Sequence, residues 1–411
     1  MMEEGLLSKR SKYVYNILLE EEGLASNLAE AGKKVVKLNR GDPAVYFKTP
    51  KYMIDAYVKA LRSNQTYYSR AEGAKTLINA VIKRYKEFYG LALSEDSIIT
   101  TEGVSEALYF INSSLINTGD MAVIFRPYYN QYMTTLELHG GRPIFADYDE
   151  RNMWAVDLDA LRKSLKSARS NGQIKRVKYM LVTNPNNPTG TVLSRRILSG
   201  LADIANEYGI FLISDEIYDE IIFNGAKFTS ISEVAKGMPY AILNGASKNF
   251  DATGFRIGFI IIPEHDRLSS ELKSKMSDYA RMRLSVNTPA QYAVAEGISN
   301  SKEHAKAIKE MVSEIEKRIN SSVRILRENE YLDVVRPNGA FYIFPHIDIK
   351  SLKFRNDKGF VEGLLKEKLL QTARGSGFGS PAHFRIVSLA TESILTDSMK
   401  KINEFCIKHA R

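Results

Sequence analysis

Short apolar runs that alternate with amphipathic stretches constrain this chain more than any other feature. Between about residues 70 and 265, the runs "MAVIF", "VKYMLVT", "IFLIS", "YAILN" and "IGFIII" are separated by segments such as "LSRRILSGLADIANEYG". The runs hold almost no polar residues, as parallel strands do when helices cover both faces of their sheet. The pattern therefore predicts an α/β fold with a mostly parallel central sheet inside a three-layer large domain.

The last hundred or so residues have a different character. Long charged helices, expected at 302–329 and 394–409, surround the two short strands "AFYIF" and "FRIVSL". This pattern predicts a smaller α+β domain. We expect residues 1–49 to form an N-terminal arm and part of the small domain, 50–300 the large domain, and 301–411 the C-terminal small domain.

The cysteine content and the lengths of the apolar runs indicate the cellular compartment of the protein. A chain of 411 residues can bury full-sized cores without covalent staples, and its single cysteine, Cys406, excludes an internal disulfide. The opening "MMEEGLLSKR" lacks the pattern of a secretory signal. No apolar run approaches the roughly 20 residues of a membrane-spanning helix. We therefore expect a cytoplasmic protein that does not contact a membrane.

Charge and histidine spacing limit the partners. The net charge of +9 is spread over stretches such as "SKEHAKAIKEMVSEIEKRIN", in which acidic and basic residues recur at helical spacing. No basic stripe with interleaved aromatic residues is evident, so nucleic acid is not an expected partner. The six histidines are scattered without metal-ligand spacing, and no catalytic metal is expected.

Three polar clusters follow directly on strand-like runs. "NPNNPTG" comes after "VKYMLVT", "SDEIYDE" after "IFLI", and "GASK" after "YAILN". Each alone is ordinary, because Asn-Pro forms turns, acidic residues begin helices, and most lysines lie on the surface. However, the carboxyl ends of parallel strands meet at one edge of a sheet, where ligands bind. Together the clusters indicate a ligand site at that edge.

These clusters belong to a larger set of motifs: "TEGVSEAL", "RPYYNQY", "NPNNPTG", "SDEIY", "SKNFDATGFRIG" and "HFRIVSLA". The set resembles the fold-type I, class I/II pyridoxal-phosphate-dependent aminotransferases over nearly the whole chain. Within that family, "LNRGDP", "MRLSVNTPAQ", "NGAFYIFP" and "GSGFG" look most like the alanine aminotransferases of archaea and bacteria. The resemblance implies pyridoxal 5'-phosphate as cofactor, bound in the large domain, and a homodimer with shared active sites.

The resemblance implies three catalytic residues. Lys248 would form an imine with the cofactor aldehyde and, once the substrate amine displaces it, move a proton between the substrate α-carbon and the cofactor C4′. Asp215 would meet the pyridine nitrogen and keep the ring protonated. Tyr218, together with Asn187, would donate to the phenolic oxygen of the cofactor.

The resemblance also implies a phosphate site. Backbone N–H groups of Val104 and Ser105 would receive the phosphate at a helix start, although simple helix capping by Thr101 or Ser105 is the plain alternative. Arg256 would donate in pairs to the phosphate oxygens, and Ser247 is a further cofactor-binding residue. In place of the serine that many members carry three residues before the lysine, this chain has Gly245.

Two tyrosines are implied at the cofactor, one of them across a subunit boundary. Tyr129 would stack on the cofactor ring, with the adjacent Tyr128 as its rival. Tyr68, in "YYSRAEG", corresponds to the tyrosine that reaches the phosphate of the partner subunit.

Substrate binding is implied at both ends of the chain. Arg385 would pair with the substrate α-carboxylate, and Gly41 and Asn187 would approach the same substrate. A second arginine, Arg281 or Arg283, is a candidate for the distal carboxylate of glutamate, with a place on the helix surface as the alternative.

The expected function is transamination in two stages. L-alanine would give pyruvate and the aminated cofactor, which would then aminate 2-oxoglutarate to L-glutamate. Aspartate and aromatic aminotransferases share the same cofactor residues, and a carbon–sulfur lyase or a cyclopropane-forming synthase of this fold is a rival. A DNA-binding regulator would carry a helix-turn-helix domain first; only about 40 residues precede "GDP", so none is expected.

Overall fold

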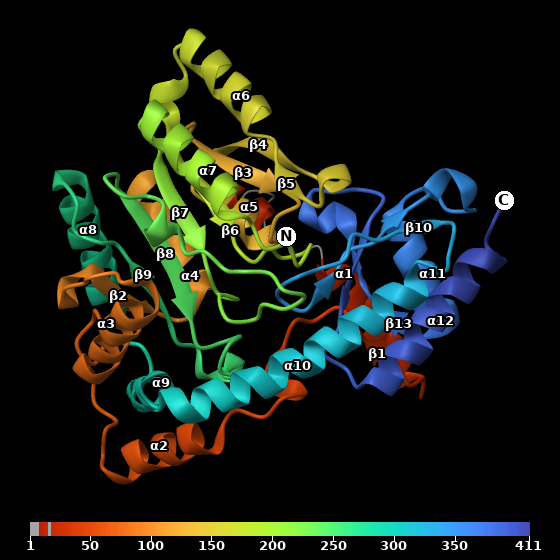
Figure 1. The fold of residues 1–411 in the computed structure, drawn as a ribbon, viewed down its shortest axis with the longest axis horizontal. Coiled ribbons are helices and arrows are strands. Elements are labelled where there is room, and N and C mark those ends of the chain that lie inside the picture. Colours follow the sequence, from red (N-terminus) through yellow and green to blue (C-terminus); the bar gives the residue numbers. More distant parts are fainter. Residues whose placement is uncertain (1–7, 15–17) are drawn as a thin grey trace, which may run out of the picture.

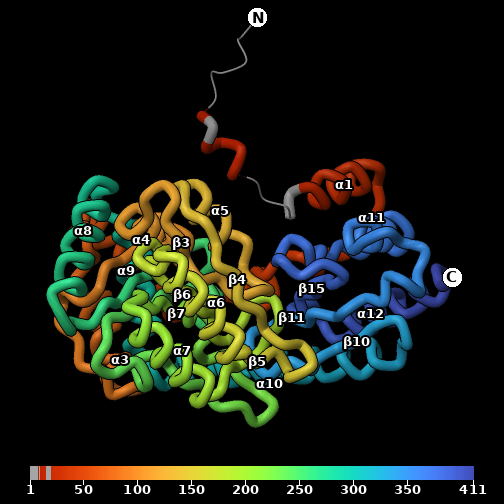
Figure 2. The backbone as a smooth tube through the Cα atoms, turned by 90° about the horizontal axis from the view of Figure 1, so that it is seen from above, coloured from red at the N-terminus to blue at the C-terminus, as the bar shows by residue number. Residues whose placement is uncertain are grey.

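The computed structural model describes residues 8–14 and 18–411. Residues 1–7 and 15–17, which belong to the predicted N-terminal arm, lie outside the described residues. Figure 1 shows a larger group of elements built on one sheet and a smaller group that contains the C-terminus. Seen from above, in Figure 2, the two groups lie side by side, with helix α1 (Leu18–Glu30) in the smaller one.

An eight-stranded sheet forms the centre of the larger group. Its strand order is β2 (Ile98–Thr101), β9 (Gly258–Ile261), β8 (Tyr240–Gly245), β7 (Phe211–Asp215), β6 (Val177–Thr183), β3 (Met121–Arg126), β4 (Arg142–Asp149) and β5 (Ala155–Val156). The pairings β3 with β4, β3 with β6, β6 with β7, and β7 with β8 are all parallel. The predicted mostly parallel sheet is confirmed.

One predicted parallel strand runs the other way. Strand β9, from the run "IGFIII", is antiparallel to both of its neighbours, β8 and β2. A parallel connection requires a crossover, usually an α-helix, and the segment 246–257 between β8 and β9 contains none. The chain therefore folds straight back, and this turn carries Lys248 and Arg256 at the same end of the sheet.

Helices cover both faces of this sheet. Neighbouring residues in a strand point to opposite faces, so Ile98 faces one core and Ile99 the other. The first core is completed by α3 (Lys75–Tyr89), α6 (Leu158–Ser170) and α7 (Arg195–Tyr208). The second is completed by α4 (Val104–Leu115), α5 (Asn130–Leu138) and α8 (Arg267–Arg283). The predicted three-layer arrangement is present.

The smaller group has a core of its own. Its three-stranded antiparallel sheet has the order β11 (Tyr342–Ile343), β15 (Phe384–Val387) and β14 (Ala373–Arg374). Further strand pairs are β1 (Val36–Lys37) with β13 (Leu370–Gln371), and β10 (Leu332–Asp333) with β12 (His346–Ile347). Its helices besides α1 are α11 (Asp357–Lys368), α12 (Glu392–Lys408) and α10 (Ser301–Leu326).

Helix α10 joins the two groups. In Figure 1 it runs from α9 (Thr288–Ser299), beside α2 (Lys51–Arg62), along the lower side of the molecule to α12. The helices predicted at 302–329 and 394–409 correspond to α10 and α12. The pairing of β1 with β13 places the segment before residue 49 with the smaller group. The domain boundaries themselves remain a prediction.

Across residues 8–14 and 18–411, no helix combines the length and the apolar character needed to cross a bilayer. The same residues hold no group of three or more side chains arranged to bind a metal ion.

Candidate active site

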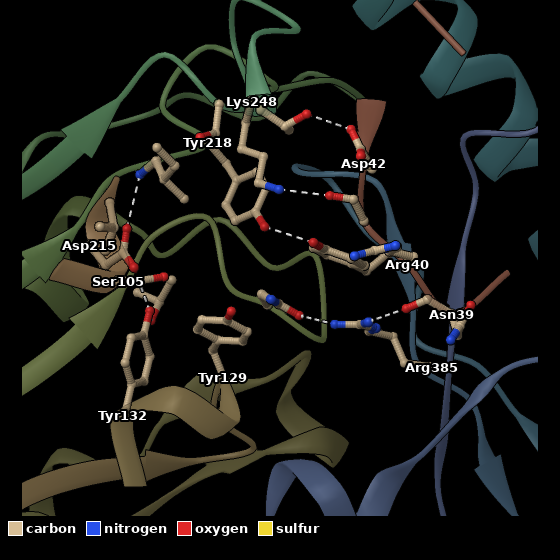
Figure 3. A pocket seen from close by; sticks show the side chains of 18 of the residues that line it. Asn39, Arg40, Asp42, Ser105, Tyr129, Tyr132, Asp215, Tyr218, Lys248 and Arg385 are labelled. Atoms are coloured by element: carbon tan, nitrogen blue, oxygen red, sulfur yellow. Dashed lines mark hydrogen bonds between the residues drawn. The ribbon is translucent and has the colours of Figure 1, made fainter. Parts of the chain in front are cut away.

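A cavity of about 430 Å³ lies at the carboxyl edge of the sheet, where the two groups of elements meet. Its walls come from the chain following β2, β3, β6, β7 and β8, together with residues 39–42, Tyr342 and Arg385. Figure 3 shows Asp215 and Tyr129 on one side of it, with Asn39, Arg40 and Asp42 on the other. Ligands bind at the carboxyl edge of parallel strands, and this is the edge at which the cavity lies.

Lys248 follows the end of β8 and points into this cavity. Its Nζ donates a hydrogen bond to the carbonyl oxygen of Gly41 at 2.7 Å. Burial, together with the positive charges of Arg385 and Arg256, lowers the pKa of Lys248 to about 8, although Asp42 acts against this shift. Near neutral pH, a useful fraction of this amine is therefore neutral and able to react.

This shift predicts how Lys248 reacts with an amine-modifying reagent. In the cofactor-free protein, the rate of acetylation at Lys248 should rise with pH and reach half of its maximum near pH 8, because only the neutral amine reacts. Exposed lysines should reach half of their maximum rate at pH ~10.4. Competitive labelling with peptide mass spectrometry measures both in one sample. A Lys248 profile that coincides with those of surface lysines would refute the shift.

Asp215 supplies a buried carboxylate at the end of β7. It accepts a hydrogen bond from the Tyr132 hydroxyl at 2.6 Å and one from the Ile217 backbone N–H at 3.2 Å. Burial raises the pKa of Asp215 to about 6, although these hydrogen bonds and Lys248 act against the rise. A carboxylate of this kind is suited to pairing with a protonated nitrogen. Tyr132, three residues beyond Tyr129 in "YYNQY", was not predicted as a site residue from the sequence.

Arg385 is a guanidinium that is only 3% exposed. It donates to Asn187 Oδ1 at 2.9 Å and to the Asn39 carbonyl oxygen at 2.5 Å, and it lies over the ring of Tyr342. Its Nε has no hydrogen-bond partner among the described residues. A buried cation whose partners are all neutral lacks charge compensation, which suits a site for an anionic ligand.

Two tyrosines, Tyr218 and Tyr342, line the cavity between Lys248 and Arg385. The hydroxyls of Tyr218 and Tyr342 are hydrogen-bonded at 2.7 Å, and both rings are buried. A Cβ at residue 41 would collide with the Tyr342 hydroxyl, so only glycine lets the backbone pass this close. Tyr342 lies in the motif "NGAFYIFP" but was not itself predicted as a site residue from the sequence.

The start of α4 offers an anion site. Gly103 precedes the helix, and no side chain of the described residues caps it. Ser105 Oγ donates to Gln131 Oε1 at 2.8 Å and Thr101 Oγ1 to the Gly103 carbonyl at 3.0 Å, so neither acts as the cap considered from the sequence. Arg256 lies against this turn, and its backbone has the unusual left-handed φ of 55°. Free N–H groups beside a guanidinium are typical of a phosphate site.

Most of the predicted site residues share this cavity. It is lined by Gly41, Val104, Ser105, Tyr129, Asn187, Asp215, Tyr218, Ser247, Lys248, Arg256 and Arg385. Tyr128 does not line it, because its ring stacks on Phe145, so the structure favours Tyr129 of the two. Tyr68 lies outside the cavity and is 75% exposed.

The structure does not place either candidate for the distal carboxylate in the cavity. Arg281 pairs with Glu72 at 2.8 Å and Arg283 with Glu106 at 3.2 Å, and neither lines the cavity. The structure also explains Gly245: a Cβ there would lie 2.7 Å from the backbone of β9, so a serine does not fit without moving that strand.

Comparison with known proteins agrees with this geometry. The family model "Aminotransferase class I and II" matches residues 33–397, which is most of the chain. The chain belongs to this family.

Individual members show how close the likeness is. The structure of alanine aminotransferase from Pyrococcus furiosus superposes with a TM-score of 0.92 at 33% identity, covering 98% of this chain and 100% of that one. Alanine aminotransferase of Mycobacterium tuberculosis is 30% identical over 94% of this chain and 88% of its own length. Aspartate aminotransferase of Bacillus subtilis is 28% identical over 94% of this chain and 95% of its own length. The enzyme is thus a pyridoxal-phosphate-dependent transaminase, and these relatives differ in substrate.

The cavity fits pyridoxal phosphate by the chemistry of its donors. The uncapped start of α4 with Arg256 suits a phosphate, the buried Asp215 suits a protonated ring nitrogen, and Lys248 offers an amine of lowered pKa. The unpartnered Nε of Arg385 leaves a separate place for a carboxylate.

Proposed function

We propose that this aminotransferase transfers the amino group of L-alanine to 2-oxoglutarate, giving pyruvate and L-glutamate in a two-stage, ping-pong exchange. The observation that carries the proposal is a single cavity that holds a reactive amine, Lys248, beside a buried guanidinium, Arg385, that has no acidic partner among residues 8–14 and 18–411. Alanine as donor is supported by the archaeal alanine aminotransferase, whose fold matches over nearly the whole chain.

Each residue has a defined task in this proposal. Arg385 holds the substrate α-carboxylate, with Gly41 and Asn187 beside it. In the first stage Lys248 Nζ would take the proton from the α-carbon of L-alanine and pass it to the cofactor C4′, and in the second stage it would carry a proton the other way, to the α-carbon of 2-oxoglutarate. Pyridoxal phosphate, when bound, supplies an electron-withdrawing ring that accepts the electron pair left on that carbon.

The cofactor itself would be held from several sides. Asp215 would keep the ring nitrogen protonated, and the hydrogen bond from Tyr132 orients this carboxylate. Tyr218 and Asn187 would donate to the phenolic oxygen, and Tyr129 would stack on the ring. The remaining cofactor contacts are the phosphate-binding groups, Val104, Ser105, Ser247 and Arg256.

A panel of amino donors tests the substrate. L-alanine, L-aspartate and L-tyrosine would each be given to the holoenzyme with 2-oxoglutarate, and L-glutamate would be measured. We expect the highest kcat/KM with alanine. A clear preference for aspartate or tyrosine would instead identify an aspartate or aromatic aminotransferase. Product from cystathionine in the absence of any oxo acid would identify a carbon–sulfur lyase.

We also propose that two chains form a homodimer with shared active sites. Helix α2 exposes Ile54, Val58 and Leu61 at helical spacing, and a small hollow beside them is lined by Tyr57 and Phe255. A partner covering this face would bring the exposed Tyr68 toward the other site. Light scattering that gives the 46.3 kDa mass of one chain at assay concentration would contradict the homodimer.

The cytoplasmic location of the protein stays a prediction.

A further inference from the structure

One cation of the cavity has no assigned task. Lys248, Arg256 and Arg385 each make hydrogen bonds to backbone or side-chain oxygens. Arg40 also lines the cavity, but in the described ranges 8–14 and 18–411 no hydrogen bond or ion pair joins its guanidinium to another residue. Its side chain is exposed, so the charge remains hydrated and able to move.

The backbone of Arg40 is nevertheless held in place. The carbonyl before it, on Asn39, accepts the hydrogen bond from Arg385 at 2.5 Å, and the carbonyl after it, on Gly41, accepts that from Lys248 at 2.7 Å. Arg40 is therefore anchored between the guanidinium that faces the α-carboxylate and the amine that faces the α-carbon. Figure 3 shows it on this wall, between Lys248 and Arg385.

Two acids on the same side of the cavity do not neutralise Arg40. Glu22 accepts hydrogen bonds from Lys37 at 2.8 Å and Gln371 at 2.9 Å. Asp42 accepts one from Thr253 Oγ1 at 2.7 Å. In residues 8–14 and 18–411 neither acid forms an ion pair or a hydrogen bond with the Arg40 guanidinium, so its positive charge is available to a ligand.

We propose that Arg40 binds the side-chain carboxylate of the dicarboxylic substrates, L-glutamate and 2-oxoglutarate, while Arg385 holds their α-carboxylate. This inference rests on the proposed function and names the residue that distinguishes its two kinds of substrate. Alanine and pyruvate have no second carboxylate, so they need nothing from Arg40. An exposed guanidinium can turn toward a long dicarboxylate and stay in water when a short substrate is bound.

Half-reactions of the holoenzyme test this proposal. In Arg40→Met, we expect kcat/KM for L-glutamate to fall about 10- to 100-fold, the loss typical of a hydrogen-bonded charge, while the value for L-alanine changes less than about threefold. Arg40→Lys keeps the charge without the paired donors and should lie in between. Arg267→Met, at the exposed start of α8, removes the same charge elsewhere and should change neither value.

Binding of unreactive acids gives a second readout. Glutarate has two carboxylates, whereas butyrate has the same kind of chain with one. We expect the wild-type holoenzyme to prefer glutarate, by calorimetry, and Arg40→Met to lose this preference. Equal losses for alanine and glutamate, or an unchanged preference for glutarate, would overturn the role of Arg40. If the wild type does not transaminate alanine, the proposed function fails, and the comparison of glutarate with butyrate still decides the role of Arg40.

Discussion

Replacing Lys248 by alanine is expected to lower the rate of amino-group transfer by about 10⁴-fold, the upper end of what a positioned acid–base group contributes. No other amine lines the cavity in the described part of the chain, so no neighbour can take over the proton at the substrate α-carbon. Single-turnover formation of pyruvate from L-alanine measures the effect. The loss should be the same with L-glutamate, because both substrates give up the same proton.

A matched variant separates chemistry from folding. Lys166→Ala removes an exposed lysine from α6 that does not line the cavity, and it should keep full activity. Both variants should unfold cooperatively in a thermal scan. Transamination by Lys248→Ala at more than about a tenth of the wild-type rate would contradict the assignment, whatever its stability.

Replacing Arg385 by methionine should lower kcat/KM by about 10²- to 10³-fold for alanine and for glutamate alike. Both substrates present an α-carboxylate, and in the described part of the chain the buried guanidinium has no acidic partner. We expect the loss mainly in KM, because this contact is present before and during the reaction. Steady-state kinetics with both donors measures it.

The substitution also leaves Asn187 Oδ1 and the Asn39 carbonyl without their donor, which by itself lowers the free energy of unfolding. Arg385→Lys therefore serves as the second variant, since it keeps a cation but cannot donate in parallel to two carboxylate oxygens. It should recover only part of the activity. Full activity in Arg385→Lys would show that charge alone suffices, and unchanged kinetics with alanine in Arg385→Met would reject the carboxylate site.

The fold could be predicted because burial leaves a simple mark on the sequence. Strands β3, β6, β7 and β8 are covered on both faces, so their residues are almost all apolar, and the runs stand out. The direction of a strand within the sheet could not be read from the sequence in this way. Strand β9 is as apolar as the parallel strands, and only the lack of a helix between 246 and 257 shows that the chain turns back.

The site could be predicted where it follows the strands directly. Asp215 and Lys248 come at or just after strand ends, so the topology alone brings them to one edge. Contacts between distant segments could not be predicted from spacing. Lys248 and Gly41 meet although 207 positions separate them, and only the structure shows that Arg40 lines the same cavity without an ion pair to any described residue.

The most direct measurement of the central claim is the stoichiometry of pyruvate release. Purified holoenzyme mixed with L-alanine alone should release about one equivalent of pyruvate per active site and then stop, as in a ping-pong exchange. Addition of 2-oxoglutarate should restart the reaction and yield L-glutamate in equal amount. Continuous turnover without an oxo acid, or no pyruvate at all in the first stage, would contradict the account.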